Sequence, residues 1–264
     1  MYTAANHTYA ICAYGNSPYL EDCIKSLKAQ TVRSTIILAT STPSEAINSL
    51  CARYEIPLFV NHGIGGIAGD WNFAVSCCKT ELVTIAHQDD IYLEGYTKQM
   101  LACLNSSENP TLYFTDYGEL RGENCVTQTK LLKIKRALLR PMRAKTLRKS
   151  RFMRRRCLSL GNSICCPSAT LICSKFKQPI FEANFGSNLD WETWEKLANA
   201  KGEFVYNPEV MILHRIHEES ETSHIINDGR RTREDYEMLC HFWPKPIAGL
   251  INRVYSTGQG SNNL

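Results

Sequence analysis

The sequence predicts an α/β fold built on a mostly parallel sheet that is flanked by helices. Short apolar runs alternate along the chain with segments whose apolar residues recur at helical spacing. The chain has 264 residues, 44% of them hydrophobic, which is enough to bury a sizeable core. Parallel strands joined by helices need right-handed crossovers, so we expect helices on both faces of the sheet.

The predicted strands are short apolar runs that end at turn or polar residues. The first ends before the turn at Gly15 and Asn16. The fourth ends in a polar quartet, residues 87–90, at the edge where open α/β sheets bind ligands. The complete set covers residues 9–13, 35–39, 58–60, 82–86, 111–117, 169–173, 204–206 and 210–213.

The predicted helices begin at recognisable signals and carry apolar residues on one face. A helix opened by Pro18 places Leu20, Ile24 and Leu27 on one side. Further helices are expected at residues 70–78, 94–104, 190–200 and 232–242, the last ended by Pro244 and Pro246, with residues 256–264 frayed.

A capping box is predicted at residues 42–45, with Pro43 at the first helical position. The helix that follows is expected to turn Ala46, Ile47 and Leu50 inward.

A strongly basic segment interrupts the second half of the chain. Residues 130–156 contain 13 Lys or Arg and no acid, whereas the rest carries 17 basic and 26 acidic side chains. This segment fits either a helical insertion or a lid. We therefore divide the chain into a first half at 1–117, a basic insertion at 118–160, a second half at 161–245 and a tail at 246–264.

Several protein classes are disfavoured by composition. The sequence has no run of 18 apolar residues, and residues 1–8 lack the basic start and long apolar run of a secretory signal. The 12 cysteines are scattered, and their adjacent pairs lack the spacing of zinc sites, so we expect reduced thiols in a cytoplasmic protein.

Two pairs of carboxylates are candidates for chemistry. Asp89 and Asp90 follow the fourth strand, and such oxygen ligands suit a divalent cation that neutralises a diphosphate. In isolation such a pair would favour a simple polar turn, but its place at the end of a strand favours a ligand site. Asp190 and Glu192 lie near a helix start, where one could act as a general base or simply favour the helix dipole.

Two further features are weaker signals on their own. Residues 63–69 hold four glycines before a helix and could approach phosphates, although they match neither dinucleotide-binding nor P-loop spacing. Arg215 and His217 follow the last strands, where the first could meet phosphate and the second a metal.

Taken in order, these segments resemble glycosyltransferase family 2, whose members have the GT-A fold. The resemblance spans roughly residues 8–225. It rests on residues 9–20 with 26–30, Gly66-Ile-Ala-Gly-Asp-Trp-Asn-Phe-Ala74, His87-Gln-Asp-Asp90, Leu189-Asp-Trp-Glu-Thr-Trp194 and Arg215-Ile-His-Glu-Glu-Ser220.

The resemblance implies a role for each matching position. Asp90, together with Asp89, would hold Mg²⁺ or Mn²⁺ against the diphosphate of the donor. His217 would be a further metal ligand. Asp190 would be the base of an inverting transfer. The chain departs from the family pattern at Gln88, Leu189 and Ser41, each of which stands where an acid is common. The donor-binding positions would be Ala13, Tyr14, Asn16, Ser41, Gly69, Asn72 and Asp89.

The expected reaction is transfer of a sugar from a UDP- or dTDP-sugar to a saccharide or lipid-linked acceptor, in building a surface polysaccharide. The alternatives are a nucleotidyltransferase and a nucleic-acid-binding protein that uses the basic segment. The segment lacks the alternating aromatics of a base-stacking platform, so no nucleic acid is expected.

The basic segment is instead expected to lie on an anionic membrane surface, at the inner face of the cytoplasmic membrane. Its cations are interleaved with Leu131, Leu132, Leu138, Leu139 and Met142, as in a helix that lies on a bilayer. A lid over the donor diphosphate is the competing explanation.

Overall fold

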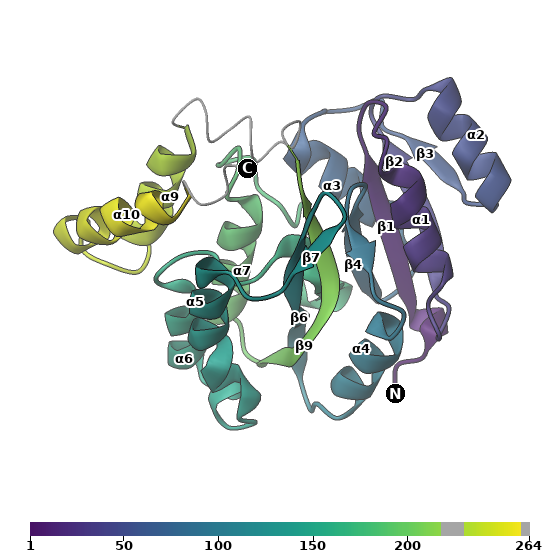
Figure 1. Ribbon diagram of the computed structural model, residues 1–264. Helices are drawn as coiled ribbons and strands as arrows, with labels where there is room; N and C mark the ends of the chain where they lie inside the picture. Colours follow the sequence, from purple (N-terminus) through teal and green to yellow (C-terminus); the bar gives the residue numbers. More distant parts are fainter. Residues whose placement is uncertain (218–229, 260–264) are drawn as a thin grey trace.

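A single mixed sheet organises the chain in the computed structural model, which describes residues 1–217 and 230–259 (Figure 1). Its strand order is β3-β2-β1-β4-β8-β6-β9-β5, and β7 pairs with β6. The strands are β1 (His7–Ala13), β2 (Thr35–Thr40), β3 (Leu58–Val60), β4 (Leu82–His87), β5 (Ile91–Tyr92), β6 (Pro110–Arg121), β7 (Asn124–Val126), β8 (Ala169–Ile172) and β9 (Glu203–Ile216).

The first half of the sheet is parallel, as predicted. β1 pairs in parallel with β2 and β4, and β2 pairs in parallel with β3. The paired residues Cys12 and His87 bring the carboxyl ends of β1 and β4 to one edge. In the second half β8 runs antiparallel to both β4 and β6, whereas β6 and β9 are parallel, so the α/β fold class is confirmed with a mixed sheet.

β9 is one long strand where the sequence analysis expected two. Asn207 pairs with Thr115 and Val210 with Asp116, so Pro208 and Glu209 form a bulge inside a continuous strand. The continuity is important for the site, because it carries residues 214–216 to the carboxyl edge of the sheet.

The helices cover both faces of the sheet. α1 (Leu20–Lys28) buries the predicted residues Leu20, Ile24 and Leu27. The remaining helices beside the sheet are α2 (Glu45–Tyr54), α3 (Ile67–Ser76), α4 (Tyr96–Asn105) and α7 (Leu189–Asn199).

The start of α2 differs from the predicted capping box. Ser44, not Thr42, is the cap, and its hydroxyl accepts a hydrogen bond from the backbone N–H of Ile47. Ile47 is buried as expected, whereas Ala46 is exposed because the later start rotates the helix.

The basic insertion is a packed helical unit. It consists of α5 (Lys130–Leu139) and α6 (Arg151–Leu158), joined by the 3₁₀ turns η2 (Arg140–Arg143) and η3 (Leu147–Lys149). Leu132, Leu139 and Met142 are at most 2% exposed. These three side chains therefore contribute to the core, which contradicts the expectation that they face a membrane.

Arginines of the insertion are stabilised by acceptors inside the protein. Arg136 pairs with Asp116 at 2.9 Å, and Arg155 pairs with Glu195. Arg154, 1% exposed, donates to the backbone carbonyls of Gly202 and Ala200. Neutralisation by carboxylates and carbonyls explains how such a dense run of cations folds compactly.

The C-terminal region contains two helices rather than one helix and a tail. α9 (Arg230–Cys240) is followed by α10 (Lys245–Gln259). Pro246 lies in the first turn of α10, where a missing N–H costs nothing, so it does not end a helix as the sequence analysis expected. Residues 260–264 lie outside the described part of the chain. Among the described helices, none is long and apolar enough to cross a bilayer.

The 12 cysteines all fall in the described ranges and are free thiols, as expected. Several are buried, and burial raises the pKa of the Cys157 thiol to about 12.

Arg148 and Glu203 provide a test of how the insertion is attached. Arg148 Nε lies 2.6 Å from Glu203 Oε2, and Glu203 is 1% exposed. Arg148→Met should lower the free energy of unfolding by about 3 kcal/mol, because it leaves a buried carboxylate without its partner. Urea denaturation measures the change.

Lys149→Met is the matched control. Its ammonium pairs with Glu108 at the surface, with side chains 46% and 84% exposed, so the loss should stay below about 1 kcal/mol. Equal losses in the two variants would contradict a structural role for the Arg148 pair.

Candidate active site

The polar quartet after β4 meets the end of β9 at the carboxyl edge of the sheet. Asp90 is fully buried and accepts a hydrogen bond from the backbone N–H of Arg215 at 3.0 Å. The same carboxylate oxygen lies 2.9 Å from His214 Nδ1. Asp90 therefore links the turn after β4 to the end of β9.

His214 is charged as a result of this contact. Burial disfavours the imidazolium, but the Asp90 carboxylate outweighs burial and raises the pKa of His214 to about 9. The other oxygen of Asp90, Oδ2, makes no hydrogen bond and lies 3.8 Å from His87 Nδ1. One oxygen of this buried carboxylate is thus available for a cation.

Asp89 is the more accessible of the two carboxylates. Its Oδ2 lies 3.0 Å from His217 Nε2, and the two side chains are 18% and 17% exposed. Burial alone would raise the pKa of Asp89, but the hydrogen bond with His217 and the nearby charges of His87 and His214 lower it to about 2. Asp89 is therefore a carboxylate at neutral pH.

His87, Asp89 and Asp90 form a group with metal-ligand chemistry. One ligand atom from each lies within 4.8 Å of the others. His87 stacks on Trp71, with ring centroids 5.2 Å apart, which fixes the imidazole over the site. The sequence analysis quoted His87 within the motif but assigned it no role, and it missed His214, whose partner is 124 residues away in the chain.

The Arg215 side chain holds the turn that carries Asp89. Its Nε donates to the backbone carbonyl of Asp89 at 2.9 Å, and its guanidinium lies 4.3 Å from the centroid of the Tyr19 ring. Asp22 accepts a longer hydrogen bond from the same group, at 3.4 Å. These contacts fix the turn that holds Asp89.

The turn after β1 lies beside the same motif. Gln88 accepts from the backbone N–H of Tyr14 and donates to its carbonyl, both at 3.0 Å. Ala13 is buried at the end of β1, and the Tyr14 side chain is 60% exposed. An amide can make both bonds, whereas a carboxylate could only accept, which gives Gln88 a structural reason to replace an acid. Asn16 accepts from the Ser44 hydroxyl at 2.7 Å.

Ser41 lies against a carboxylate supplied from elsewhere in the chain. Its hydroxyl donates to Asp70 Oδ2 at 2.9 Å, and Asn61 donates to Asp70 Oδ1 at 2.8 Å. Position 41, where the family often has an acid, is a serine here. The carboxylate beside it comes from Asp70, in the first turn of α3.

Gly69 and Asn72 have local roles in α3. A Cβ at Gly69 would lie 2.1 Å from the carbonyl oxygen of Ile64, so only glycine fits against the preceding loop. Asn72 accepts from the backbone N–H groups of Ile180 and Phe181 and donates to the Phe181 carbonyl. Both residues shape the wall of the site, and their contact with a donor stays a prediction.

Asp190 begins α7 on the other side of the site. It accepts from Asn162 at 2.7 Å and from the backbone N–H of Trp191 at 2.8 Å. Burial raises its pKa, against the opposing effects of Arg231 and Asn162. The alternative carboxylate, Glu192, is 4% exposed and accepts from Asn184 at 2.9 Å, so Asp190 is the better placed of the two for proton transfer.

α9 holds the loop that precedes Asp190. Glu234 accepts from the backbone N–H groups of Gly186 and Ser187, both at 2.8 Å, and from the Ser187 hydroxyl at 2.6 Å. Asn188 donates to Asp235 at 2.8 Å. The start of α7 is therefore fixed by a segment that follows it by more than forty residues.

The comparisons with known proteins agree with this geometry. Residues 8–178 match the family described as Glycosyl transferase family 2. No curated protein matches.

Among solved structures, the mannosyltransferase PcManGT from Pyrobaculum calidifontis superposes with a TM-score of 0.64 at 13% identity, over 97% of this chain and 70% of that one. S. aureus TarS 1-349 gives 0.62 at 10% identity, over 93% and 69%. Glucosyl-3-phosphoglycerate synthase from Mycobacterium tuberculosis gives 0.57 at 11%, over 88% and 77%.

The fold and the polar edge of its sheet define an α/β enzyme of the GT-A class. The chain belongs to glycosyl transferase family 2, since the match covers more than half of its length. This confirms the resemblance and favours sugar transfer over the nucleotidyltransferase and nucleic-acid alternatives.

Proposed function

We propose that this protein transfers a sugar from a nucleotide-diphosphate donor, a UDP- or dTDP-sugar, in a reaction that requires Mn²⁺ or Mg²⁺. The observation that carries the proposal is the ionised Asp89 facing His217, beside a buried Asp90 oxygen that has no hydrogen-bond partner. Carboxylate oxygens and an imidazole are a donor set that suits these cations.

Asp89 and His217 would hold the cation, together with the Asp90 oxygen that has no hydrogen-bond partner and the nearby His87 imidazole. When bound, the cation neutralises the charge that develops on the diphosphate leaving group. PcManGT has been solved with GDP-Man and Mn²⁺, and TarS 1-349 with UDP-GlcNAc, which shows that this fold accommodates such donors. The nucleoside is proposed to lie near Ala13, Tyr14, Asn16 and Ser41, with Gly69 and Asn72 in the adjoining wall.

Asp190 is the proposed general base. The carboxylate accepts the proton of the acceptor hydroxyl as that oxygen attacks the anomeric carbon, and the configuration at that carbon inverts in a single displacement. The hydrogen bonds from Asn162 and the Trp191 backbone N–H orient the carboxylate. Its raised pKa makes it a better proton acceptor than an exposed aspartate.

The acceptor is proposed to be a saccharide or lipid-linked glycan of a surface polysaccharide, met by a cytoplasmic enzyme at an anionic membrane surface. Lys130, Arg140 and Lys145 of the insertion are exposed. α10 adds an apolar stripe that the sequence analysis missed, formed by Ile247, Leu250 and Val254, which are 44%, 64% and 69% exposed.

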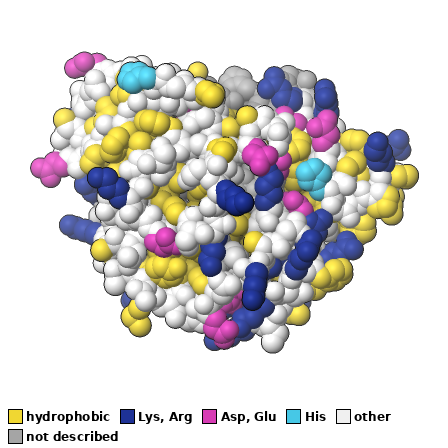
Figure 2. All heavy atoms as spheres, turned by 180° about the vertical axis from the view of Figure 1, so that it is seen from behind, with side chains coloured by type: hydrophobic (Ala, Val, Ile, Leu, Met, Phe, Trp, Pro, Cys, Tyr) yellow, Lys and Arg dark blue, Asp and Glu magenta, His cyan; other side chains and the backbone are white. Residues whose placement is uncertain are grey.

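The stripe on α10 has the character of a surface-binding helix. Its residues recur at helical spacing, Lys245 and Arg253 are its charged residues, and it contains no acid. Seen from behind, hydrophobic side chains lie beside Lys and Arg at the edge formed by the C-terminal helices (Figure 2). Apolar insertion and attraction to anionic lipid would then act together.

Asp89→Asn tests the metal site. The change should raise the Mn²⁺ concentration needed for half-maximal donor hydrolysis by about tenfold or more, because a charged ligand becomes a neutral amide. Glu123→Gln, an exposed acid at the β6–β7 turn, is the control and should behave as wild type. Asp90→Asn is a second arm. If only this variant changes the metal dependence, Asp90 rather than Asp89 is the ligand.

Asp190→Asn tests the base. Turnover should fall about 100-fold or more while donor affinity stays close to wild type, because the group acts in the chemical step. In the wild type, the raised pKa should place the loss of kcat on acidification above the usual range of an aspartate. Glu192→Gln is the comparison. An inactive Glu192→Gln beside an active Asp190→Asn would assign the base to the other carboxylate.

Leu250→Ser with Val254→Ser tests the membrane surface. We expect wild-type protein to sediment with phosphatidylglycerol-rich vesicles and to be released by high salt, and the double variant to bind about tenfold less strongly, since apolar burial is lost. Ile64→Ser, at another exposed apolar residue, is the control. Equal binding of all three proteins, or equal binding to phosphatidylcholine vesicles, would rule this surface out.

A further inference from the structure

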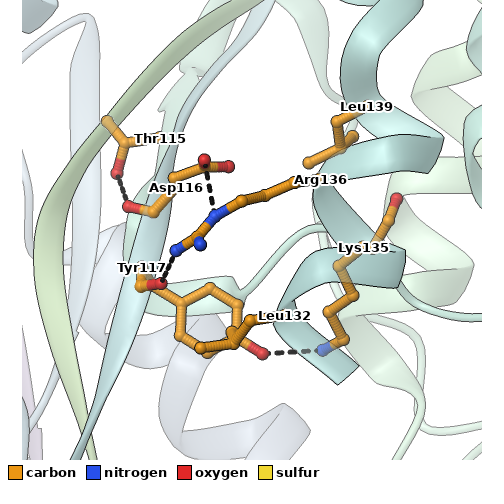
Figure 3. A pocket seen from close by; sticks show the side chains of 8 residues that line it. Thr115, Asp116, Tyr117, Leu132, Lys135, Arg136 and Leu139 are labelled. Carbon is orange, nitrogen blue, oxygen red and sulfur yellow. Dashed lines mark hydrogen bonds and ion pairs between the residues drawn. The ribbon is translucent and has the colours of Figure 1, made fainter. Parts of the chain in front are cut away.

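Lys135 differs from the other cations of the insertion. It lies on α5, is partly buried, and donates to the Tyr117 hydroxyl at 2.9 Å (Figure 3). Within the described part of the chain, no carboxylate oxygen lies within 4.0 Å of its ammonium group. Its neighbour Arg136, by contrast, is paired with Asp116 at 2.9 Å. A partly buried cation without a counter-charge loses hydration without recovering an ion pair.

The position of Lys135 links it to the active site. The Tyr117 ring packs edge-on against His214, with centroids 6.3 Å apart, and His214 pairs with Asp90. The Tyr117 ring therefore separates the ammonium group from His214, the partner of Asp90. The ammonium group lies on the β6–β9 side, whereas the proposed nucleoside residues follow β1 and β2. Lys135 therefore lies away from the residues proposed to bind the nucleoside, on the half of the sheet where we expect the acceptor.

A small hollow with polar and apolar residues in its lining lies between β6 and α5. Tyr117, Lys135, Arg136 and Ser163 contribute to its lining, and its volume is about 10 Å³, room for one water-sized atom. Asp116, the only acid in the lining, already accepts from Tyr206 at 2.5 Å and pairs with Arg136. The hollow is too small for a sugar ring, so only a single oxygen of a bound group could enter it.

We propose that Lys135 binds an oxyanion of the acceptor, so that the preferred acceptor carries a phosphate or a carboxylate. This inference rests on the proposed function and specifies its acceptor class. A charged oxygen would give the Lys135 ammonium the counter-charge that the protein does not provide, with Tyr117 orienting the ammonium group. The phosphate of a lipid carrier and the carboxylate of an acidic sugar share this chemistry.

The test compares Lys135→Met with Lys133→Met in the full chain. Lys133 is exposed two residues earlier on α5, so the control removes the same charge from a different face. Binding is measured by calorimetry on protein saturated with UDP and Mn²⁺. The probes are dodecyl phosphate against dodecyl maltoside, and glucuronate against glucose, so that the two sources of the oxyanion are separated.

Wild type and Lys133→Met should bind one anionic probe about tenfold more strongly than its neutral counterpart, and Lys135→Met should lose this preference. Lys135→Arg should retain it, which shows that the charge is responsible even if Lys135→Met is less stable.

No anionic preference in the wild type, or the same preference in Lys135→Met as in Lys133→Met, would overturn the inference. A loss of UDP affinity in Lys135→Met alone would assign the ammonium group to the donor diphosphate and overturn it too. The proposed function fails separately, if the wild type binds no nucleotide.

Discussion

The buried carboxylate of Asp90 is the interaction on which the rest of the site depends. It is fully inaccessible to solvent, and it joins the turn after β4 to the end of β9 through His214 and the backbone of Arg215. Removing one partner of a buried charged pair leaves the other uncompensated, at a cost of about 3–5 kcal/mol. This cost keeps the turn in one conformation, so Asp89 is presented to the edge of the sheet with its carboxylate facing His217.

A buried ion pair also anchors the basic insertion, at the opposite end of β9. Glu203 begins that strand and binds Arg148, while His214 near its end pairs with Asp90. Some of the cations that looked free in the sequence, among them Arg136 and Arg148, attach the insertion to the sheet. Among the described residues, Lys135 and the exposed Lys130, Arg140 and Lys145 have no carboxylate partner within 4.0 Å.

The parts of the fold that could be predicted from sequence are those set by local pattern. The strands near residues 9–13, 35–39 and 82–86 were identified because each apolar run alternates with a helix of clear spacing. The single strand β9 and the helix α10 were missed for a common reason. Two strands were expected on either side of residues 207–209, and Pro246 was expected to end a helix, although a bulge and a first helical turn both tolerate a residue without an N–H.

The site divides in the same way. Asp89, Asp90 and His217 were found because they follow strands, whereas the contributions of His214 and Asp70 depend on pairings across the fold that no local pattern reports. The prediction that Leu132, Leu139 and Met142 face a membrane was wrong, because apolar spacing along the segment does not reveal which apolar residues pack inside.

The hydrogen bonds from residues 186–188 to Glu234 and Asp235 mean that the proposed base and the proposed nucleoside site are held by different parts of the chain. The loop at residues 186–188 is fixed by α9, yet the residues expected near the nucleoside are supported by β1, β2 and α3. With the proposed base at Asp190, sequence changes in α9 would alter the alignment of the acceptor while leaving the proposed nucleotide site intact. Such a division would let related enzymes diverge in what they glycosylate while keeping the same sugar donor.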